Sequence, residues 1–394
     1  MSTAVFTIAS KNYFANVHTL MQSLEQSNPT MERFVVVVDE LDSEFLSNQR
    51  NFTIISLAEL NLPHPKQMEF RYDIMEFNTA VKPFALRLLM KKFNRVVYLD
   101  PDIYVYERLT PIEDAFDAGA QIVLTPHFNH LFEEDGMHPD EPDIMRSGIY
   151  NLGFIAVQDG AESIEMVDWW SKRLEKKCIN KQEKGIFVDQ KWIDLVPGYY
   201  RNVSILHDSG LNVAYWNLSH REVKKDNGSF KVNGEPLYFF HFSGFSVARV
   251  DSVSKHQNRF TMNDIGDANE LFIKYADCVI SNGIHKWKEY SYSFEKYTDG
   301  RSVLPEHRKK YADDEQLQGF CGEDPFQYPE YFYENKTPQL RNDGVNLVGY
   351  IRSEHGLGEA ARLTANCLEC VGGYHGMLMI LRWGIPHANR IIHI

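Results

Sequence analysis

Short, nearly uninterrupted apolar runs are the feature that most constrains how this chain folds. A strand with one solvent-exposed face alternates polar and apolar residues. That alternation is absent from FVVVVDE at 34–40, RVVYLDPDIYV at 95–105 and YNLGFIAV at 150–157. Such runs are typical of strands buried on both faces of a parallel sheet. Further strands are expected at 3–9, 51–60, 121–127 and 237–245, and helices at 16–24, 79–93 and 162–177. Strands that alternate with helices predict a doubly wound α/β fold.

The charge of the chain narrows its class. Its 394 residues carry a formal net charge of −13, which argues against a nucleic-acid-binding surface because such a surface needs a basic stripe. A nucleotide is compatible with this charge, since a bound divalent cation can neutralise its phosphates. The N-terminus has no signal-peptide pattern, no apolar run is long enough to span a bilayer, and five scattered cysteines fit a reducing compartment. We therefore expect a cytoplasmic protein without a transmembrane segment.

Two carboxylates, Asp100 and Asp102, leave the apolar strand on either side of Pro101, which breaks it. Ligands of open α/β sheets bind at the carboxyl ends of the strands. Side chains at i and i+2 lie on one side of a strand, so both acids are expected to reach one cation. A hard divalent cation takes oxygen ligands, shares its other sites with phosphates and neutralises a departing nucleoside diphosphate. The pair therefore indicates metal-assisted chemistry on a nucleotide.

Two other interpretations of the acid pair stay open. It can be an acidic turn that caps the next helix, because a lone D-x-D is common. It can also belong to a phosphatase of the haloacid dehalogenase kind, in which the first acid is a nucleophile. That class has a small Thr or Val two residues after the second acid, where this chain has Tyr104.

The surroundings of the acid pair resemble family-8 glycosyltransferases and their GT-A relatives. AVFTIASKNY at 4–13 resembles the family's first strand and nucleoside-binding loop, and Lys82-Pro83 resembles the basic position before the D-x-D strand. YNLGF at 150–154 is similar to the F-N-A-G element, VDQKWID at 188–194 to the D-Q-D-x-L-N element, and HFSG at 241–244 to the start of the H-x-x-G-x-x-K-P-W element. The resemblance implies a GT-A nucleotide-sugar-binding, Rossmann-like fold.

Each matching residue takes an expected role from this resemblance. Asn151 and Asp189 are expected to bond hydroxyls of the donor sugar, and Gln190 is expected beneath its anomeric carbon. The implied ligands of the metal, Mn²⁺ or Mg²⁺, are Asp100, Asp102 and His241. The implied donor-binding residues are Thr7, Ala9, Asn12, Tyr13, Lys82, Asp100 and Gly244.

The sequence also departs from the family pattern. Ser10 and Lys11 stand where members often have acids, so contacts with the base and ribose are expected to differ. After Gly244 the chain reads FSVAR instead of the family's lysine and tryptophan, which leaves Arg249 as the candidate for a diphosphate contact. Structural alternatives stay open for three of these residues: His241 can be a core histidine, Lys82 a solvated helix lysine and Asn151 a turn former, although function is favoured for His241 and Asn151.

A histidine-rich loop separates two of the expected strands. Residues 127–148 are acidic, carry several prolines and include His127, His130 and His138, and they predict a long functional loop or lid. The loop has no cysteine and no regular ligand spacing, so acceptor binding or solvation is favoured over a zinc site.

The composition of the chain suggests three parts. Residues 1–250 are expected to form the GT-A catalytic domain and 251–335 a helical extension, while 336–394 combine a linker with the truncated start of a second domain. VGYIRSEHGLGEAARL at 348–363 resembles the first strand, loop and helix of GT-B glycosyltransferases such as family 4. Cys367 and Cys370 form a C-x-x-C that is either incidental or a redox or zinc site.

These expectations describe a metal-dependent glycosyltransferase. It would move a hexose from a nucleotide donor, UDP-linked by resemblance, to a saccharide or glycan acceptor with retention, in glycan or polysaccharide biosynthesis. The alternatives are a non-catalytic nucleotide-sugar-binding module of a larger tandem glycosyltransferase, and a metallo-phosphohydrolase. Donor hydrolysis distinguishes the first from an enzyme, and phosphate release from simple monoesters identifies the second.

Overall fold

The computed structural model describes residues 2–47, 51–333, 346–349, 377–380 and 390–393. The chain forms two compact units, one of Met1–Pro63 with Ile74–Ser293 and one of His64–Asp73 with Phe294–Ile394. The last change from one unit to the other, between Ser293 and Phe294, falls inside the stretch 251–335 that was expected to be a helical extension. The three-part division expected from the sequence stays a prediction.

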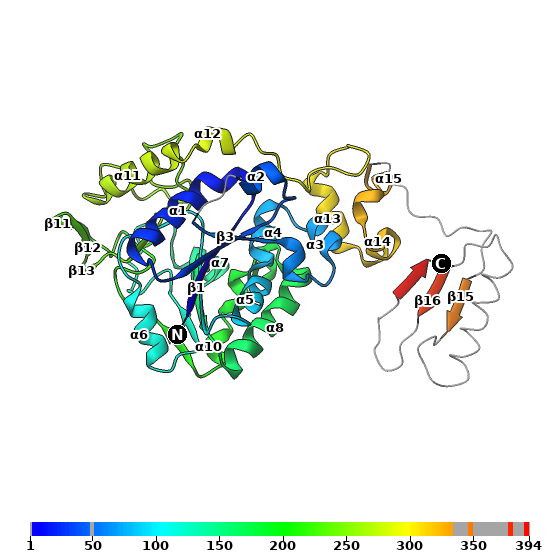
Figure 1. Cartoon of the computed structure of the whole chain (residues 1–394), viewed down its shortest axis with the longest axis horizontal. Helices are drawn as coiled ribbons and strands as arrows, with labels where there is room; N and C mark the ends of the chain where they lie inside the picture. Colours follow the sequence, from blue (N-terminus) through cyan, green and yellow to red (C-terminus); the bar gives the residue numbers. More distant parts are fainter. Residues whose placement is uncertain (1, 48–50, 334–345, 350–376, 381–389, 394) are drawn as a thin grey trace. The chain divides into compact units, whose positions relative to one another are not determined.

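The first unit is built on a seven-stranded sheet (Figure 1). Its strands, in spatial order, are β10 (Val203–Ile205), β6 (Ile122–Leu124), β7 (Phe154–Gln158), β4 (Arg95–Leu99), β1 (Thr3–Ala9), β2 (Glu32–Val37) and β3 (Thr53–Ser56). All neighbours are parallel except β7, which runs antiparallel to both β4 and β6. The predicted α/β class with a mostly parallel sheet is confirmed. The reversal of β7 was not anticipated, and it is possible because an antiparallel neighbour needs no crossover helix.

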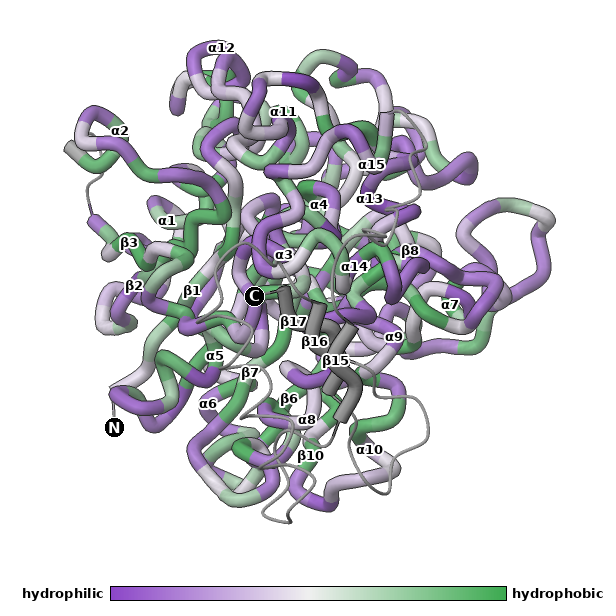
Figure 2. Tube along the Cα trace, turned by 90° about the vertical axis from the view of Figure 1, so that its right-hand side faces the viewer, coloured by the Kyte–Doolittle hydropathy of each residue, from purple (hydrophilic) through white to green (hydrophobic). Residues whose placement is uncertain are grey.

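Helices cover both faces of this sheet. On one face, Val97 and Leu99 join a buried cluster with the apolar side of α1 (Phe14–Ser27). On the other face, Tyr98 meets α5 (Lys82–Met90), which packs against α8 (Ala161–Lys177). The strands are buried on both sides, and Figure 2 shows the resulting hydrophobic stretches on β6 and β7. The expected helices at 16–24, 79–93 and 162–177 correspond to α1, α5 and α8.

The expected strand at 95–105 is two strands in different sheets. It ends as β4 at Leu99 and resumes as β5 (Ile103–Val105), which pairs antiparallel with β14 (Phe239–His241). Pro101 lies between them, where its missing N–H interrupts no ladder. The expected strand at 237–245 is thus reduced to the three residues of β14.

The first unit contains further helices and strands. They are η1 (Lys11–Tyr13), α2 (Ser43–Ser47), η2 (Leu57–Leu60), α4 (Ile74–Ala80), α6 (Thr110–Asp117), α7 (Glu141–Ser147), β8 (Asn180–Lys181), η3 (Gln182–Lys184), β9 (Ile186–Phe187), α9 (Gln190–Ile193), α10 (Val196–Tyr199), β11 (Val223–Asp226), β12 (Ser229–Val232), β13 (Glu235–Pro236), α11 (Ala268–Ser281) and α12 (Ile284–Trp287). No helix in the described ranges is long and apolar enough to cross a membrane.

The second unit joins two distant parts of the chain. It contains α3 (Pro65–Arg71), α13 (Pro305–Asp313), α14 (Glu315–Cys321), η4 (Pro325–Gln327), α15 (Glu330–Tyr333), and a sheet of β15 (Asn346–Gly349), β16 (Met377–Ile380) and β17 (Arg390–His393). The predicted strand at 346–350 is confirmed as β15. The loop and helix expected after it, and the C-x-x-C at 367–370, lie outside the described residues.

A buried guanidinium holds the segment 64–73 inside this unit. Arg308 donates to the carbonyl oxygens of Glu69 at 2.8 Å, Phe70 at 2.8 Å and Tyr72 at 2.7 Å, and also to that of Phe294. Only 7% of Arg308 is exposed, so water cannot replace these bonds.

Arg308→Met is expected to lower the free energy of unfolding of this unit by at least about 3 kcal/mol. Each buried carbonyl left without a donor costs about 1–3 kcal/mol. Chemical denaturation measures the loss, with Lys309→Met, at the neighbouring exposed position, as the matched control. Equal stability of the two variants would show that the Arg308 hydrogen bonds contribute nothing.

Candidate metal centre

The turn between β4 and β5 directs two carboxylates to one place. The amide of Asp100 donates to the carbonyl of Gly153 at 2.8 Å, and the carbonyl of Asp100 accepts from Ile103 at 3.1 Å. On the other side, the carbonyl of Asp102 accepts from the amide of Phe242 at 2.9 Å. The acids were expected to converge through strand alternation, but they lie beyond β4 in a turn. Backbone hydrogen bonds to the start of β7 and the end of β14 hold that turn.

His241 reaches the same place from β14. Register places it opposite Ile103, the residue after Asp102. Its Nε2 lies 3.1 Å from Oδ1 of Asp102 and 3.6 Å from Oδ2 of Asp100. One ligand atom from each of the three residues lies within 4.8 Å of the others. The structure thus brings together the three predicted ligands, and two carboxylates with one imidazole form a donor set suited to a divalent cation.

Burial and neighbouring charges both shift the pKa values of this group. Burial opposes the charged form of His241, but the carboxylates of Asp102 and Asp100 outweigh it and raise the pKa of the ring. Burial also raises the pKa of Asp100, against the opposing pull of Lys82 and His241. Side-chain exposure is 28% for Asp100 and 16% for Asp102, so the group keeps access to solvent on the carboxylate side.

Lys82 lies beneath the acid turn in a buried ion pair. Its Nζ is 2.5 Å from Oδ2 of Asp189 and 2.7 Å from the carbonyl of Leu152, and it lies 4.2 Å from the centre of the Tyr98 ring. The hydroxyl of Tyr98 in turn donates to Asp100 at 2.6 Å. The interpretation of Lys82 as a solvated helix lysine is therefore wrong, because 1% of it is exposed. Its contact with a diphosphate stays a prediction.

The residues expected near the sugar are engaged in hydrogen bonds with the chain itself. Oε1 of Gln190 accepts from the amide of Leu152 at 3.0 Å, and its Nε2 donates to the carbonyl of Ser147 at 3.1 Å. Asp189 is 2% exposed and pairs with Lys82, while Asn151 is 7% exposed and lies against His241. Their contacts with a sugar stay predictions.

The nucleoside-binding loop predicted from the sequence follows β1. Thr7 and Ala9 are buried in the strand, Ser10 donates its hydroxyl to Asn12 at 2.7 Å, and Asp39 accepts from the amide of Lys11 at 2.7 Å. Tyr13 leaves 38% of its surface exposed. Burial of the hydroxyl end, followed by the charges of Asp102 and Asp100, raises the pKa of Tyr13, so this loop borders the acid pair.

The metal group has a neighbour that the sequence did not reveal. Gly244 has a φ of +71°, and a Cβ there would lie 2.4 Å from Oγ of Ser254 and 2.5 Å from Cδ2 of His256. Burial and Lys255 lower the pKa of His256, whereas Asp102 raises it, so this ring lies near the acid pair. No motif includes His256, and spacing alone gave no signal for it. Arg249, the candidate phosphate contact, is exposed.

Position 153 is a glycine, and its lack of a side chain leaves room for the metal group. A Cβ on Gly153 would lie 2.4 Å from Cε1 of His241 and 2.8 Å from Oδ1 of Asn151.

Gly153→Ala is expected to displace His241 and to weaken Mn²⁺ binding by about tenfold or more, which is the typical effect of disturbing a group that orients a metal ligand. Isothermal titration with Mn²⁺ measures it. Gly198→Ala is the control, because a Cβ there would meet nothing within 4 Å. Unchanged affinity of Gly153→Ala would contradict the placement of His241.

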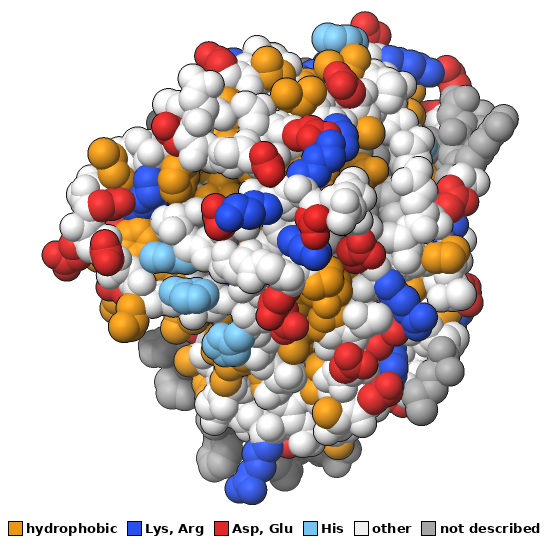
Figure 3. Space-filling view, turned by 90° about the vertical axis from the view of Figure 1, so that its left-hand side faces the viewer, with side chains coloured by type: hydrophobic (Ala, Val, Ile, Leu, Met, Phe, Trp, Pro, Cys, Tyr) orange, Lys and Arg blue, Asp and Glu red, His pale blue; other side chains and the backbone are white. Residues whose placement is uncertain are grey.

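The lid predicted at 127–148 contains the helix α7. His138, Asp140 and Asp143 also lie within metal-ligand distance of one another, but Asp140 caps α7 and Asp143 pairs with Arg146. These contacts explain the cluster without an ion. Figure 3 shows histidine side chains close together on one face of the molecule, and His130 stacks on His220 with ring centres 5.7 Å apart.

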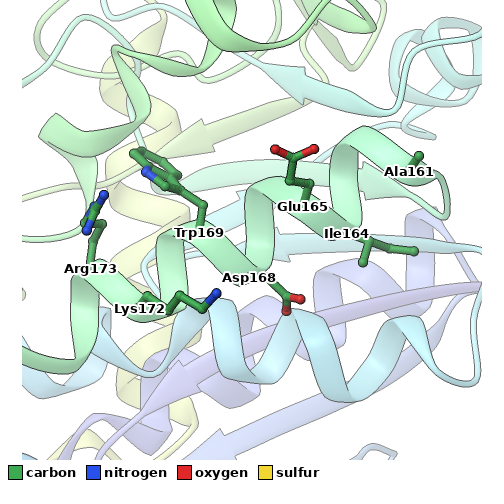
Figure 4. A pocket seen from close by; sticks show the side chains of 7 residues that line it. All are labelled: Ala161, Ile164, Glu165, Asp168, Trp169, Lys172 and Arg173. Atoms are coloured by element: carbon green, nitrogen blue, oxygen red, sulfur yellow. The ribbon is translucent and has the colours of Figure 1, made fainter. Parts of the chain in front are cut away.

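A surface hollow lies elsewhere, along α8. It measures about 590 Å³ and is lined by residues such as Trp169, Asp168 and Lys172 (Figure 4). None of the predicted site residues lines this hollow.

The chain is similar in sequence to two curated proteins, both of them uncharacterized. No protein-family model matches the sequence. The chain is 26% identical over 281 residues to the uncharacterized protein YfnF of Bacillus subtilis (strain 168), covering 69% of this chain and 91% of the relative. It is 24% identical over 320 residues to the uncharacterized protein YfnD of the same organism, covering 78% and 96%.

Solved structures with some likeness were also found. The galactosyltransferase LgtC, in complex with donor and acceptor sugar analogues, is 17% identical with a TM-score of 0.42, and the match covers 70% of this chain and 95% of LgtC. The glycosyltransferase GlyE of Streptococcus pneumoniae TIGR4 is 16% identical with a TM-score of 0.41, covering 75% and 67%. Likeness at this level assigns no activity to the chain.

Proposed function

We propose that this protein is a metal-dependent glycosyltransferase. It moves a hexose from a nucleotide donor, UDP-linked, to a saccharide or glycan acceptor with retention, in glycan or polysaccharide biosynthesis in the cytoplasm. The observation that supports this most is the meeting of Asp100, Asp102 and His241 at the carboxyl end of β4. Open α/β sheets bind their ligands at this end.

The donor set suits one demand of the reaction. When a sugar leaves its nucleoside diphosphate, negative charge grows on the diphosphate, and a bound Mn²⁺ or Mg²⁺ supplies the Lewis acid that stabilises it. Asp100 and Asp102 would hold the cation by their carboxylates and His241 by Nε2. Lys82 is already paired with Asp189, which leaves its charge largely neutralised. The cation would therefore be the main counter-charge at this point.

The sugar would lie on the side of Asn151, Asp189 and Gln190. Asn151 gives one hydrogen of Nδ2 to His127, and its second hydrogen remains for a sugar hydroxyl. We place the base and ribose at the loop around Asn12 and Tyr13, which borders the acid pair. The resemblance of 348–363 leads us to propose further that this stretch belongs to a GT-B-like domain.

Chelation tests the proposal. EDTA is expected to abolish nucleotide release from a panel of UDP-hexoses, and added Mn²⁺ is expected to restore it. Lys82, the buried lysine next to the acid turn, is already paired with Asp189 and is not expected to take over from the metal. Turnover that survives EDTA would point to a metal-free site, and metal-dependent phosphate release from simple monoesters without sugar transfer would favour a phosphohydrolase.

A further inference from the structure

We infer that Asn151 and His127 are positioning residues that fix the ring of His241 in one tautomer, with Nδ1 protonated and Nε2 open to a cation. The inference rests on the proposed metal centre and adds to it a relay of three buried side chains. These come from the loop 127–148, the turn before β7, and β14. Each hydrogen bond in the relay has a direction that a backbone group determines.

The first backbone group is the amide of Gly153. It donates at 3.1 Å to Oδ1 of Asn151, and because a backbone N–H can only donate, the atom facing it must be the amide oxygen. Asn212 donates to the same oxygen at 3.1 Å, with its own Nδ2 also held by Thr125 at 2.9 Å. The orientation of the Asn151 amide is therefore set by its surroundings.

The oxygen of Asn151 then determines the state of His241. Nδ1 of His241 lies 3.2 Å from this oxygen, so Nδ1 must carry a hydrogen to bond it. A neutral imidazole with a hydrogen on Nδ1 has its lone pair on Nε2. Nε2 is the atom that faces Asp102 and Asp100, and a cation held between them would take the place of the hydrogen that Nε2 otherwise donates to Asp102. The ring is thus arranged to bind a cation through the nitrogen nearest to the carboxylates.

The second backbone group fixes the other end of the relay. Nδ1 of His127 lies 3.2 Å from the carbonyl oxygen of Ile149, which can only accept, so this nitrogen also carries the hydrogen. Nε2 of His127 is then free to accept from Nδ2 of Asn151 at 3.2 Å. The two ends of the relay give the same orientation for Asn151. Burial lowers the pKa of His127 to about 4, which keeps this ring neutral and able to accept.

An aromatic side chain packs against both histidines of the relay. Trp216 lies edge-on to both histidine rings, with ring centres 5.1 Å from His127 and 5.3 Å from His241. All four side chains are buried, with Asn151 the most exposed at 7%; they are His127, Asn151, Trp216 and His241. Water therefore has poor access to replace the oxygen of Asn151 once that oxygen is removed.

The expected effects differ between two substitutions at the same position. Asn151→Leu removes the acceptor for Nδ1 of His241, and Mn²⁺ affinity is expected to fall by about 10- to 100-fold, as for other groups that orient a metal-binding histidine. Asn151→Asp keeps an oxygen acceptor and is expected to stay within a few-fold of the wild type. His127→Phe leaves the Asn151 amide without its acceptor and is expected to lose affinity by less than Asn151→Leu.

Two measurements test the inference on the full chain. Titration with Mn²⁺, followed by electron paramagnetic resonance without nucleotide, gives the affinity. Proton–nitrogen spectra of ¹⁵N-histidine at alkaline pH, where the rings are neutral, report which ring nitrogen of His241 carries the hydrogen. The wild type and Asn151→Asp should show hydrogen on Nδ1, and Asn151→Leu should show a mixture or the other tautomer. Asn263→Leu, at an exposed asparagine, is the control.

The outcomes separate this inference from the proposed function. Asn151→Leu with the wild-type tautomer and affinity would overturn the relay, while the metal centre would stand. If Asn151→Leu does not fold, a tenfold loss in folded Asn151→Asp overturns it equally. A wild type that binds no Mn²⁺ contradicts the metal centre, while the tautomer spectra still decide whether Asn151 sets the state of His241.

Discussion

Asp102→Asn should reduce transfer of the donor sugar by about 10³-fold while the fold survives, because it removes charge from a ligand that acts where the diphosphate charge develops. The side chain of Asp102 is 16% exposed, and the bond from the amide of Phe242 that holds the turn goes to the backbone carbonyl of Asp102. The backbone of the turn therefore stays intact in the variant.

The measurement is kcat for nucleotide release at saturating Mn²⁺, together with a circular dichroism spectrum of the variant. Asp277→Asn, at an exposed position on α11, supplies a matched loss of one carboxylate away from the turn. Normal turnover in Asp102→Asn would remove this residue from the metal centre and leave the acid turn as a structural feature.

Lys82→Met should lower the free energy of unfolding by about 3–5 kcal/mol, the usual effect of removing one partner from a buried ion pair. The variant leaves Asp189 charged at a site that is 2% exposed, where burial already raises the pKa of the carboxyl. A second change, Asp189→Leu, is expected to recover much of the loss, because it removes the uncompensated charge.

Urea denaturation of the two single variants and the double variant gives the coupling between the two residues. Lys91→Met, at an exposed lysine after α5, is the control for the loss of a positive charge. Additive losses in the double variant would contradict a direct interaction between Lys82 and Asp189.

Sequence pattern predicted the main elements of the sheet because their apolar content is local. β2 ends in the apolar residues 34–37, β4 contains the apolar residues 96–99, and α8 has a clear apolar face. The reversal of β7 and the short strand β10 were not predicted, since strand direction depends on contacts with residues far away in the chain. The same holds for the second unit, in which residues 64–73 join a part of the chain that starts at Phe294.

The candidate site was predicted only in part, because motifs are local and many contacts of the site join distant parts of the chain. Asp100, Asp102 and His241 were found through motifs, and the structure places them together. The burial of Lys82 was not anticipated, because nothing near it in the sequence identifies Asp189 as its partner. The contacts of Trp216 were missed entirely, since only the folded chain brings this residue to His241.

The placement of residues 64–73 in the second unit has a consequence for how the protein is made. During translation this segment emerges long before Arg308, which later caps three of its carbonyl groups. Until then the apolar side chains of this segment that are buried in the folded protein lack their packing partners from the later part of the chain; they are Met68, Phe70 and Tyr72. Exposed apolar segments of this kind are prone to aggregate and are typical chaperone substrates. A nascent chain stalled before Phe294 is therefore the form of this protein that we expect to depend most on chaperones.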